Sequence, residues 1–457
     1  MKNRITLLLS LLFFGLHMGF SQDNEEDLTT LSIMGEYAKA RNYEAAYAPF
    51  MELRQRNPKF NRAIFVYGES ILLDKIEKSS GAEKAAFIND LVKMWEERAV
   101  HFPGNTPQGT PKGQFLAKAC QLMYDHKDVL GKTNSQLYEC FDAAYAADKS
   151  TFTDAKSLYT YFSLMVDLYD AGSKPAEDLF NKYDDIVEKI EEEVKNFSES
   201  LNELLAKEEA GTALTSREGQ YKNFYEGSLA NFDLISAGID QKLGERANCE
   251  NLIPLYEKGF EANKTNALWL QRAAGKMTEK ECTGSPLYFK IVNAYHELNP
   301  SANSAYFLAV LKDKEGKTNE AIQFYEQAIS LETDNFKKAQ FYNRIALKFK
   351  SRGSYAKARS YFREALKFNP SNVNPHLSIA AMYADSANDC GDTQFNKRAV
   401  YWLAAEEARK AGGAGARHVE SYMGRAPSKS DIFTAGNEGQ TIKIGCWIGA
   451  SVTVPKL

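Results

Sequence analysis

Residues 304–370 decide the fold, and they read SAYFLAVLKDKEGKTNEAIQFYEQAISLETDNFKKAQFYNRIALKFKSRGSYAKARSYFREALKFNP. Two copies of one helix–turn–helix pattern follow each other in this stretch. Small residues recur where two helices would cross closely, and large apolar residues occupy the i, i+3 and i+4 positions beside them. Gly316 and Gly353 end the first helix of each copy, where a positive φ is often needed, and Pro370 ends the last helix. The small residues are Ala309, Ala321 and Ala328 in the first copy and Ala346, Ala358 and Ala365 in the second.

This spacing resembles the tetratricopeptide repeat (TPR). Gly316 and Gly353 are separated by close to the ~34-residue period of that repeat. The resemblance predicts an all-α fold, a TPR-type α-solenoid of helical hairpins, which a short C-terminal β-hairpin tail completes. Repeats of this kind stack into an extended surface instead of forming a catalytic cleft.

Composition shifts along the chain suggest five segments. The expected order is a signal peptide over 1–21, degenerate N-terminal TPR-like repeats over 22–150, a long-helix hairpin over 151–245, a TPR array over 246–410 and a tail with a β-hairpin over 411–457.

The N-terminus has the pattern of a secretory signal. Lys2 and Arg4 precede an apolar run, and Gly19 and Ser21 supply the small residues expected before a cut ahead of Gln22. An uncleaved membrane anchor is the alternative, but the apolar run is short for a span and an acidic segment follows it. No other stretch is apolar enough to span a bilayer, so the mature protein is expected in the periplasm.

Six cysteines remain in the exported chain, and an even number in an oxidising compartment suggests three disulfides. Sequential pairing is the simplest of the fifteen arrangements. Free buried thiols are the alternative. The expected pairs are Cys120 with Cys140, Cys249 with Cys282, and Cys390 with Cys446.

A long helix is expected from Pro175 to Glu209, with an apolar seam at steps of three and four residues on an otherwise acidic helix. We expect it to pack against a helix over 218–242 as an antiparallel hairpin. A protruding coiled coil that docks a partner is the second interpretation.

Strand periodicity appears only in the tail, where apolar residues alternate from Ile442 to Val454 with a turn near Gly449. Because a lone hairpin is marginally stable in water, it must gain support elsewhere. Packing on the last helices as an end cap is the first expectation, and strand addition to a partner's sheet is the second.

Charge and motifs limit the function. The formal net charge is −4, and loss of Lys2 and Arg4 with the leader makes the mature chain more acidic still, which argues against nucleic acid as a principal partner. The sequence has no HExxH, GxSxG, Walker or GxGxxG motif. We therefore expect no enzyme, no catalytic residue, no metal and no cofactor.

Protein binding remains as the expected activity. In this repeat type the first helix of each hairpin lines a concave face, and its side chains here mix amides, an aromatic ring and charges. For any single residue, an ordinary solvated helix face is an equally good interpretation. The expected partner-binding residues are Asn303, Tyr306, Val310, Asp313, Lys314, Gln340, Asn343, Leu347, Lys350 and Ser351.

Two further sequence patterns indicate which group of TPR proteins the chain resembles. The segments 398-RAVYWLA-404 and 444-IGCWIG-449 resemble exported TPR proteins of Bacteroidetes. Asp385-Ser386-Ala387 is similar to the O-glycosylation sequon of envelope proteins of that phylum, and it falls in an insertion expected to be exposed. Ser386 is therefore a candidate modification site.

The resemblance implies a periplasmic scaffold that docks another envelope protein, in an outer-membrane assembly or secretion complex. Fold alone does not determine function. One alternative is an accessory or enzyme of envelope polysaccharide processing with a site in the irregular N-terminal half. Another is a secreted adhesion protein or export substrate.

Overall fold

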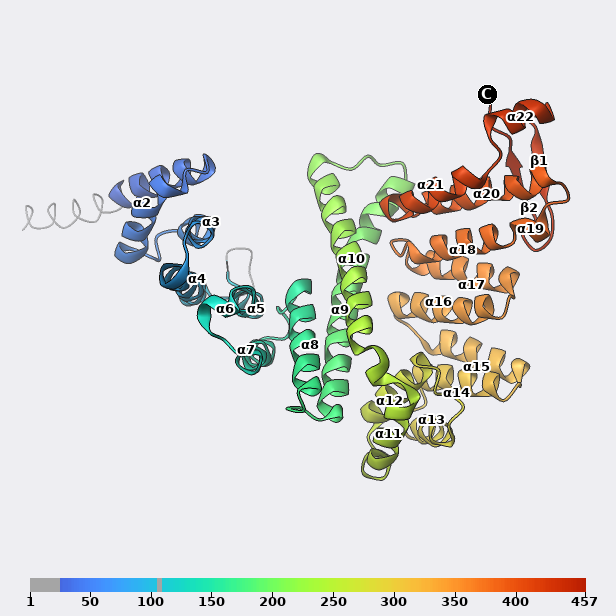
Figure 1. Cartoon of the computed structure of the whole chain (residues 1–457), viewed down its shortest axis with the longest axis horizontal. Helices are drawn as coiled ribbons and strands as arrows, with labels where there is room; N and C mark the ends of the chain where they lie inside the picture. Colours follow the sequence, from blue (N-terminus) through green and yellow to red (C-terminus); the bar gives the residue numbers. More distant parts are fainter. Residues whose placement is uncertain (1–24, 105–108) are drawn as a thin grey trace, which may run out of the picture. The chain divides into compact units, whose positions relative to one another are not determined.

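A computed structural model describes residues 25–104 and 109–457. The predicted signal peptide lies outside the described residues. The described chain is predominantly helical, with one two-stranded sheet near the C-terminus (Figure 1). The described chain forms two compact units, which divide between Ile186 and Val187. The segment boundaries predicted at 150/151, 245/246 and 410/411 stay predictions.

The first unit is a succession of packed helices. Its core is apolar, and Phe50, Phe65 and Trp95 are among its buried rings. Arg54 is buried too, and it pairs with Asp90 at 3.0 Å and Glu97 at 2.7 Å. The elements are a helix over 25–39, α2 (Tyr43–Arg56), α3 (Ala63–Lys78), α4 (Gly81–His101), α5 (Lys112–Asp125), α6 (Lys127–Leu130), α7 (Asn134–Ala147), α8 (Ala155–Asp170) and the start of α9 (Ala176–Glu209).

The second unit contains the rest of α9 and the array of hairpins. Its further elements are α10 (Ser216–Leu243), η1 (Gly244–Ala247), α11 (Cys249–Asn263), α12 (Ala267–Glu279), α13 (Pro286–Leu298), α14 (Ala302–Lys314), α15 (Thr318–Leu331), α16 (Asn335–Ser351), α17 (Tyr355–Phe368), α18 (Asn374–Asp385), α19 (Ala387–Cys390), α20 (Gln394–Arg409), η2 (Gly412–Gly415), α21 (Ala416–Arg425), α22 (Lys429–Ala435), β1 (Thr441–Ile444) and β2 (Ala450–Thr453).

The two clear repeats fold as predicted, as the hairpins α14–α15 and α16–α17. Gly316 and Gly353 follow the first helices with φ of +78° and +72°, a left-handed conformation that favours glycine. Each of the six predicted alanines is at most 1% exposed, so the helices cross closely at those positions. The all-α solenoid prediction is confirmed.

Helices α9 and α10 form the predicted antiparallel hairpin. Phe197 of α9 contacts the rings of Phe224, Tyr225 and Phe232 on α10. Near the turn, Lys222 of α10 bonds Glu208 of α9 at 2.6 Å. A capping box at Thr215 begins α10 by satisfying backbone N–H groups of its first turn.

The tail packs on the array, as the end-cap interpretation predicts. Strands β1 and β2 pair antiparallel, with Ile442 opposite Val452, and both lie against α20. The inward side chains of Ile444, Ile448 and Val454 are nearly fully buried. The turn is wider than expected, because residues 445–449 separate the strands. Helices α21 and α22 were not predicted.

All three disulfides join the cysteines in sequential order. The Cα atoms of Cys120 and Cys140 are 5.8 Å apart, those of Cys249 and Cys282 are 5.4 Å apart, and those of Cys390 and Cys446 are 5.1 Å apart. The first bond links α5 to α7, the second joins the start of α11 to the segment after α12, and the third ties the tail to α19.

Candidate functional site

Helix α14 is enclosed on nearly every side. The side chains of Tyr306 and Val310, predicted to face a partner, are 4% and 5% exposed. Tyr306 packs against the rings of Phe307, Tyr325 and Phe341. The prediction that Tyr306 and Val310 form an accessible binding surface is therefore wrong, because both side chains are buried, Tyr306 in part by Phe341 of the next repeat.

Asp313 is engaged within the array. Its carboxylate accepts a hydrogen bond from the Tyr325 hydroxyl at 2.7 Å and pairs with Arg352 at 2.8 Å. The proximity of Asp313 adds to burial in raising the pKa of Tyr325, whose hydroxyl stays protonated. These contacts connect two repeats, which is a structural role.

Helix α16 leaves more of its predicted face open. The Leu347 side chain is 45% exposed, which is high for a leucine on a packed helix. The other predicted residues here and at the ends of α14 are partly or fully exposed. They are Asn303, Lys314, Gln340, Asn343, Lys350 and Ser351. They stay candidate binding residues.

The most informative arrangement is one that the sequence did not predict: α9 lies along the array of its own unit. Four of its polar residues follow one helix face at steps of three, four and seven, and each bonds a different place in the array. We call them the polar stripe. Their ion pairs are Glu188 with Arg272 of α12 at 2.8 Å, Glu191 with Arg344 of α16 at 3.9 Å, and Lys195 with Asp334 at the start of α16.

Asn202 is the fourth member of the polar stripe. Its side-chain N–H group donates to the amide oxygen of Asn369 at 3.0 Å, and its Oδ1 accepts from the backbone N–H of Ser371 at 3.0 Å. Both partners lie between α17 and α18. The stripe thus reaches from α12 to the loop after the second clear repeat.

Beside the polar stripe, α9 has a buried apolar face, while residues such as Glu199 and Glu203 are exposed. Ile190, Leu201 and Leu204 are 3–8% exposed. Lys189 is fully buried, and its ammonium bonds Glu193 at 2.7 Å and Glu192 at 3.0 Å. The contacts of α9 with α10 are thus mainly between aromatic rings, with ion pairs near the turn, whereas those of the polar stripe with the array are all polar.

One buried carboxylate gathers several donors. Glu407 of α20 accepts hydrogen bonds from His376 Nδ1 at 2.6 Å, from Arg363 at 2.7 Å and from Lys410 at 3.0 Å. Burial alone would raise the pKa of Glu407, but these hydrogen bonds lower it to about 2. A carboxylate held ionised by three donors ties helices together and does not supply a general acid or base.

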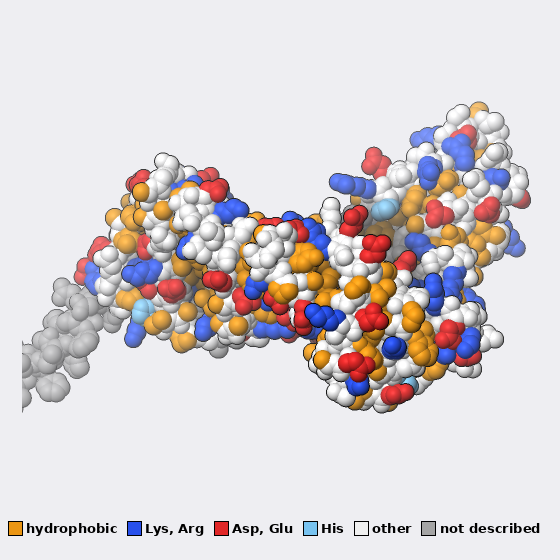
Figure 2. Space-filling view, turned by 60° about the horizontal axis from the view of Figure 1, so that its bottom comes forward, with side chains coloured by type: hydrophobic (Ala, Val, Ile, Leu, Met, Phe, Trp, Pro, Cys, Tyr) orange, Lys and Arg blue, Asp and Glu red, His pale blue; other side chains and the backbone are white. Residues whose placement is uncertain are grey.

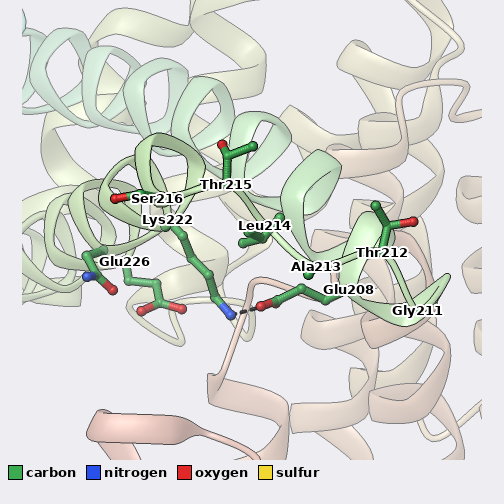
Figure 3. Close-up of a pocket in the computed structure, with 11 residues that line it drawn as sticks. Glu208, Gly211, Thr212, Ala213, Leu214, Thr215, Ser216, Lys222 and Glu226 are labelled. Carbon is green, nitrogen blue, oxygen red and sulfur yellow. Dashed lines mark hydrogen bonds and ion pairs between the residues drawn. The ribbon is translucent and has the colours of Figure 1, made fainter.

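A surface depression lies at the turn between α9 and α10 (Figure 3). Thr212 and Leu214 line it, and the ion pair between Lys222 and Glu208 spans it. It is open and carries no convergent set of titrating groups. Among the residues that the structure describes, no cluster of His, Cys, Asp and Glu could hold a metal ion.

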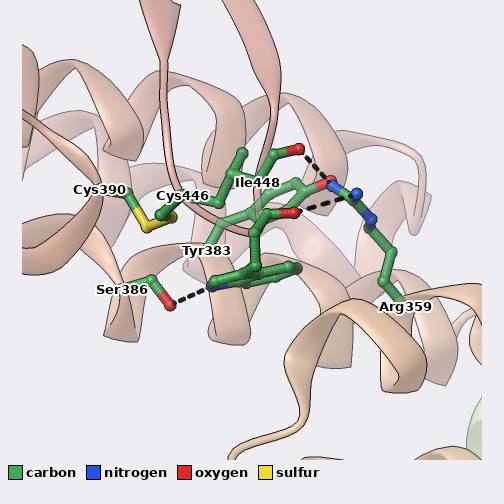
Figure 4. The surroundings of a disulfide bond; sticks show 7 residues. Arg359, Tyr383, Ser386, Cys390, Cys446 and Ile448 are labelled. Atoms are coloured by element: carbon green, nitrogen blue, oxygen red, sulfur yellow. Dashed lines mark hydrogen bonds between the residues drawn. A yellow bond between two sulfur atoms is a disulfide. The ribbon is translucent and has the colours of Figure 1, made fainter.

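Ser386 is not on an exposed loop. It is 4% exposed, and its hydroxyl accepts a hydrogen bond from the Trp447 indole N–H at 2.9 Å (Figure 4). The predicted insertion instead contains α19, which the disulfide at Cys390 connects to the tail. The prediction that Ser386 is accessible to glycosylation is therefore wrong for the folded protein.

Charges of both signs are mixed over the face of the molecule shown in Figure 2, and hydrophobic side chains lie between them. This pattern offers no extended basic surface for a nucleic-acid backbone on that face. Within the described ranges, no helix is both long and apolar enough to cross a bilayer.

Comparison with known proteins supports the repeats. The family model described as Tetratricopeptide repeat matches residues 302–335 and 339–372, which are the two clear hairpins. The Photosystem I assembly protein Ycf3 of Cyanophora paradoxa is 33% identical over 99 residues, which is 20% of this chain. The chain spans 57% of that relative. The chain therefore contains TPR repeats, as the sequence predicts.

Solved structures that match this chain are similar to it only weakly and share little of its sequence. A human IFIT1 dimer with PPP-AAAA covers 80% of this chain and 73% of its own, at 14% identity and a TM-score of 0.31. Yeast Tom70 covers 90% of both chains, at 11% identity and a TM-score of 0.29. Similarity at this level carries no inference about ligands.

Proposed function

We propose that the protein is an exported scaffold, a periplasmic TPR protein that binds another protein of the cell envelope in an outer-membrane assembly or secretion complex. The observation that carries the proposal is the TPR array itself, whose repeats stack into an extended surface instead of enclosing a reaction site. Partly exposed amides, Lys350 and the exposed Leu347 on α16 give that surface hydrogen-bonding and apolar contacts for a protein partner.

Three features support the compartment and the type of partner. The N-terminal sequence pattern is that of a cleaved signal. All six cysteines form pairs, which is typical of an oxidising compartment. The relative from Cyanophora paradoxa is named as an assembly protein, and we extend a role in assembly to this chain on the shared repeats.

In-cell crosslinking followed by affinity purification and mass spectrometry tests the proposal. We expect one or a few envelope proteins to be recovered with the wild-type chain, and the recovered chain to begin near Gln22. Substitution of Leu347 by Glu should reduce that recovery, whereas Leu331→Glu on α15, an equally exposed leucine, provides the matched control. Recovery of the wild-type chain alone, or of a chain that retains its leader and free thiols, would contradict the proposal.

A further inference from the structure

The way in which α9 is held against the array differs from the way in which it is held against α10. Aromatic rings such as Phe197 and Phe224 make the contact between α9 and α10 along the helices, and the ion pair between Lys222 and Glu208 adds to it near the turn. The described contacts of the polar stripe with the array are ion pairs and amide hydrogen bonds. Apolar contacts of the first kind keep two helices together, whereas polar contacts of the second kind can be exchanged for similar ones.

The ion pairs of the stripe are partly solvated. The side chains of Glu188 and Glu191 remain 43% and 47% exposed, and that of their partner Arg344 remains 42% exposed. Ion pairs that face water contribute little to stability and are weakened by salt. The pairs of Glu188 and Glu191 therefore select for charge and add little stability, whereas Asn202 bonds the buried Asn369 and Ser371.

The partners of the polar stripe show which chemical groups the array binds at each position. Arg272 and Arg344 face carboxylates, Asp334 faces an ammonium group, and the segment around Asn369 bonds an amide. These receptors follow α9 over four helical turns, which corresponds to roughly 21 Å of helix. Only a helix with this order of groups on one face can satisfy all of them together.

We propose that the array of the second unit is a receptor for an amphipathic α-helix of a partner protein, and that α9 occupies this receptor in the partner-free protein. The partner helix would carry two carboxylates, an ammonium group and an amide in the order of the polar stripe. This inference rests on the proposed scaffold function and specifies its partner. Because α9 binds α10 through apolar contacts, the hairpin can leave the array as one element when the partner helix arrives.

The test measures binding of a synthetic peptide with the wild-type sequence of residues 187–209, labelled with a fluorophore, to the full-length oxidised protein. In the wild-type chain the tethered α9 competes with the peptide at high effective concentration. In a variant with Glu188→Lys, Lys195→Glu and Asn202→Ala, that competition is weakened. We expect fluorescence anisotropy to show at least tenfold tighter peptide binding to the variant, and this binding to decline with salt.

A matched control changes α9 away from the array. Glu203→Lys alters charge at an exposed position of the same helix, outside the polar stripe, and it should leave peptide affinity at the wild-type value. A peptide that carries the three substitutions itself should bind the variant at least tenfold more weakly than the wild-type peptide does.

A second variant acts from the receptor side and does not depend on the first. In Arg272→Glu, a peptide with Arg in place of Glu188 should bind more tightly than the wild-type peptide, because the charges of the pair are exchanged. Equal affinities of both peptides for this variant, or no gain in the three-substitution variant, overturn the receptor assignment. Recovery of envelope partners in cells would still support the scaffold function, so the two proposals fail separately.

Discussion

Glu407 shows at the residue scale how an ionised group can be buried in the array. Three donors on separate side chains hold its charge, and one of them, Arg363, belongs to α17 of the second clear repeat. The same carboxylate therefore connects that repeat to α18 and α20, and its protonation would loosen all three helices.

The first prediction concerns acid stability. The pKa of Glu407 is lowered to about 2 in the folded protein and returns to about 4.3 when the chain unfolds, so its stabilisation is complete above about pH 5 and is lost as the pH falls toward 2. Glu407→Gln should lower the free energy of unfolding by about 2–3 kcal/mol at pH 7 and by much less near pH 2. Urea unfolding at both pH values measures this, with the exposed Glu406→Gln as the control. Equal losses at both pH values would contradict the explanation.

The second prediction compares two glycines. A Cβ at Gly68 would lie 2.3 Å from Phe50 Cε2 and 2.8 Å from Met94 Sδ, whereas a Cβ at Gly227 of α10 would meet nothing within 4 Å. Gly68→Ala should therefore destabilise the first unit by about 1–3 kcal/mol. Gly227→Ala should stabilise α10 by up to about 1 kcal/mol, because alanine favours the helix.

Thermal unfolding of the two glycine variants, compared with that of the wild-type chain, shows whether each substitution raises or lowers stability. A stabilising Gly68→Ala would show that Phe50 and Met94 can move aside without cost, and the close packing described for this core would then be incorrect.

At the element scale, sequence periodicity predicted elements better than it predicted surfaces. The glycines at 316 and 353, the alanines and the apolar seam of α9 each act through local geometry, so their hairpins could be predicted. The burial of Tyr306 could not, because it depends on Phe341 in the next repeat and on the packing around α14. The contacts of α9 with the array were not predicted, because the partners of its residues, such as Asn369 for Asn202, lie far away in the sequence.

The third prediction concerns the tail. The rings of Tyr355 and Tyr383 pack against Trp447, and the Arg359 guanidinium bonds the backbone carbonyls of Trp447 and Ile448. Trp447→Ala should destabilise the attachment of the tail by up to about 3 kcal/mol, the lower end of the range for truncating a buried aromatic side chain, because Trp447 is only partly buried. Hydrogen exchange over 441–454 should rise strongly, while exchange in α14 and α15 stays unchanged. Uniform exchange throughout the second unit would show instead that the tail stabilises the whole array.

At the scale of the whole molecule, the disulfides are divided between the two units. The first unit contains one bond and the second contains two, and each unit has its own buried residues. Loss of a disulfide should therefore destabilise the unit that contains it and leave the other unit unchanged.

The fourth prediction follows from this division. Replacing Cys120 and Cys140 together by serine should destabilise the first unit by about 2–4 kcal/mol, the usual effect of losing a native bond of this kind. Hydrogen exchange should rise in α5, α7 and α8 and stay at the wild-type level in α16 and α17. The matched control replaces Cys249 and Cys282. It should raise hydrogen exchange in α16 and α17 and leave exchange in α5, α7 and α8 at the wild-type level. Equal effects on both units in either variant would show that the molecule unfolds as one cooperative body.

The tail that Trp447 and the bond from Cys390 to Cys446 secure has a consequence for the length of the assembly. A stack of similar hairpins is a one-dimensional lattice, and an uncovered last hairpin offers the next molecule the same face that it would offer a further hairpin of its own chain. Head-to-tail contacts of that kind propagate into fibres unless their rotation closes into a ring. Helix α21 packs along α20 and the hairpin of β1 and β2 contacts it as well, so we expect the two together to block such growth at this end. We therefore expect that the bond between Cys390 and Cys446, by holding the tail in place, helps to limit head-to-tail association.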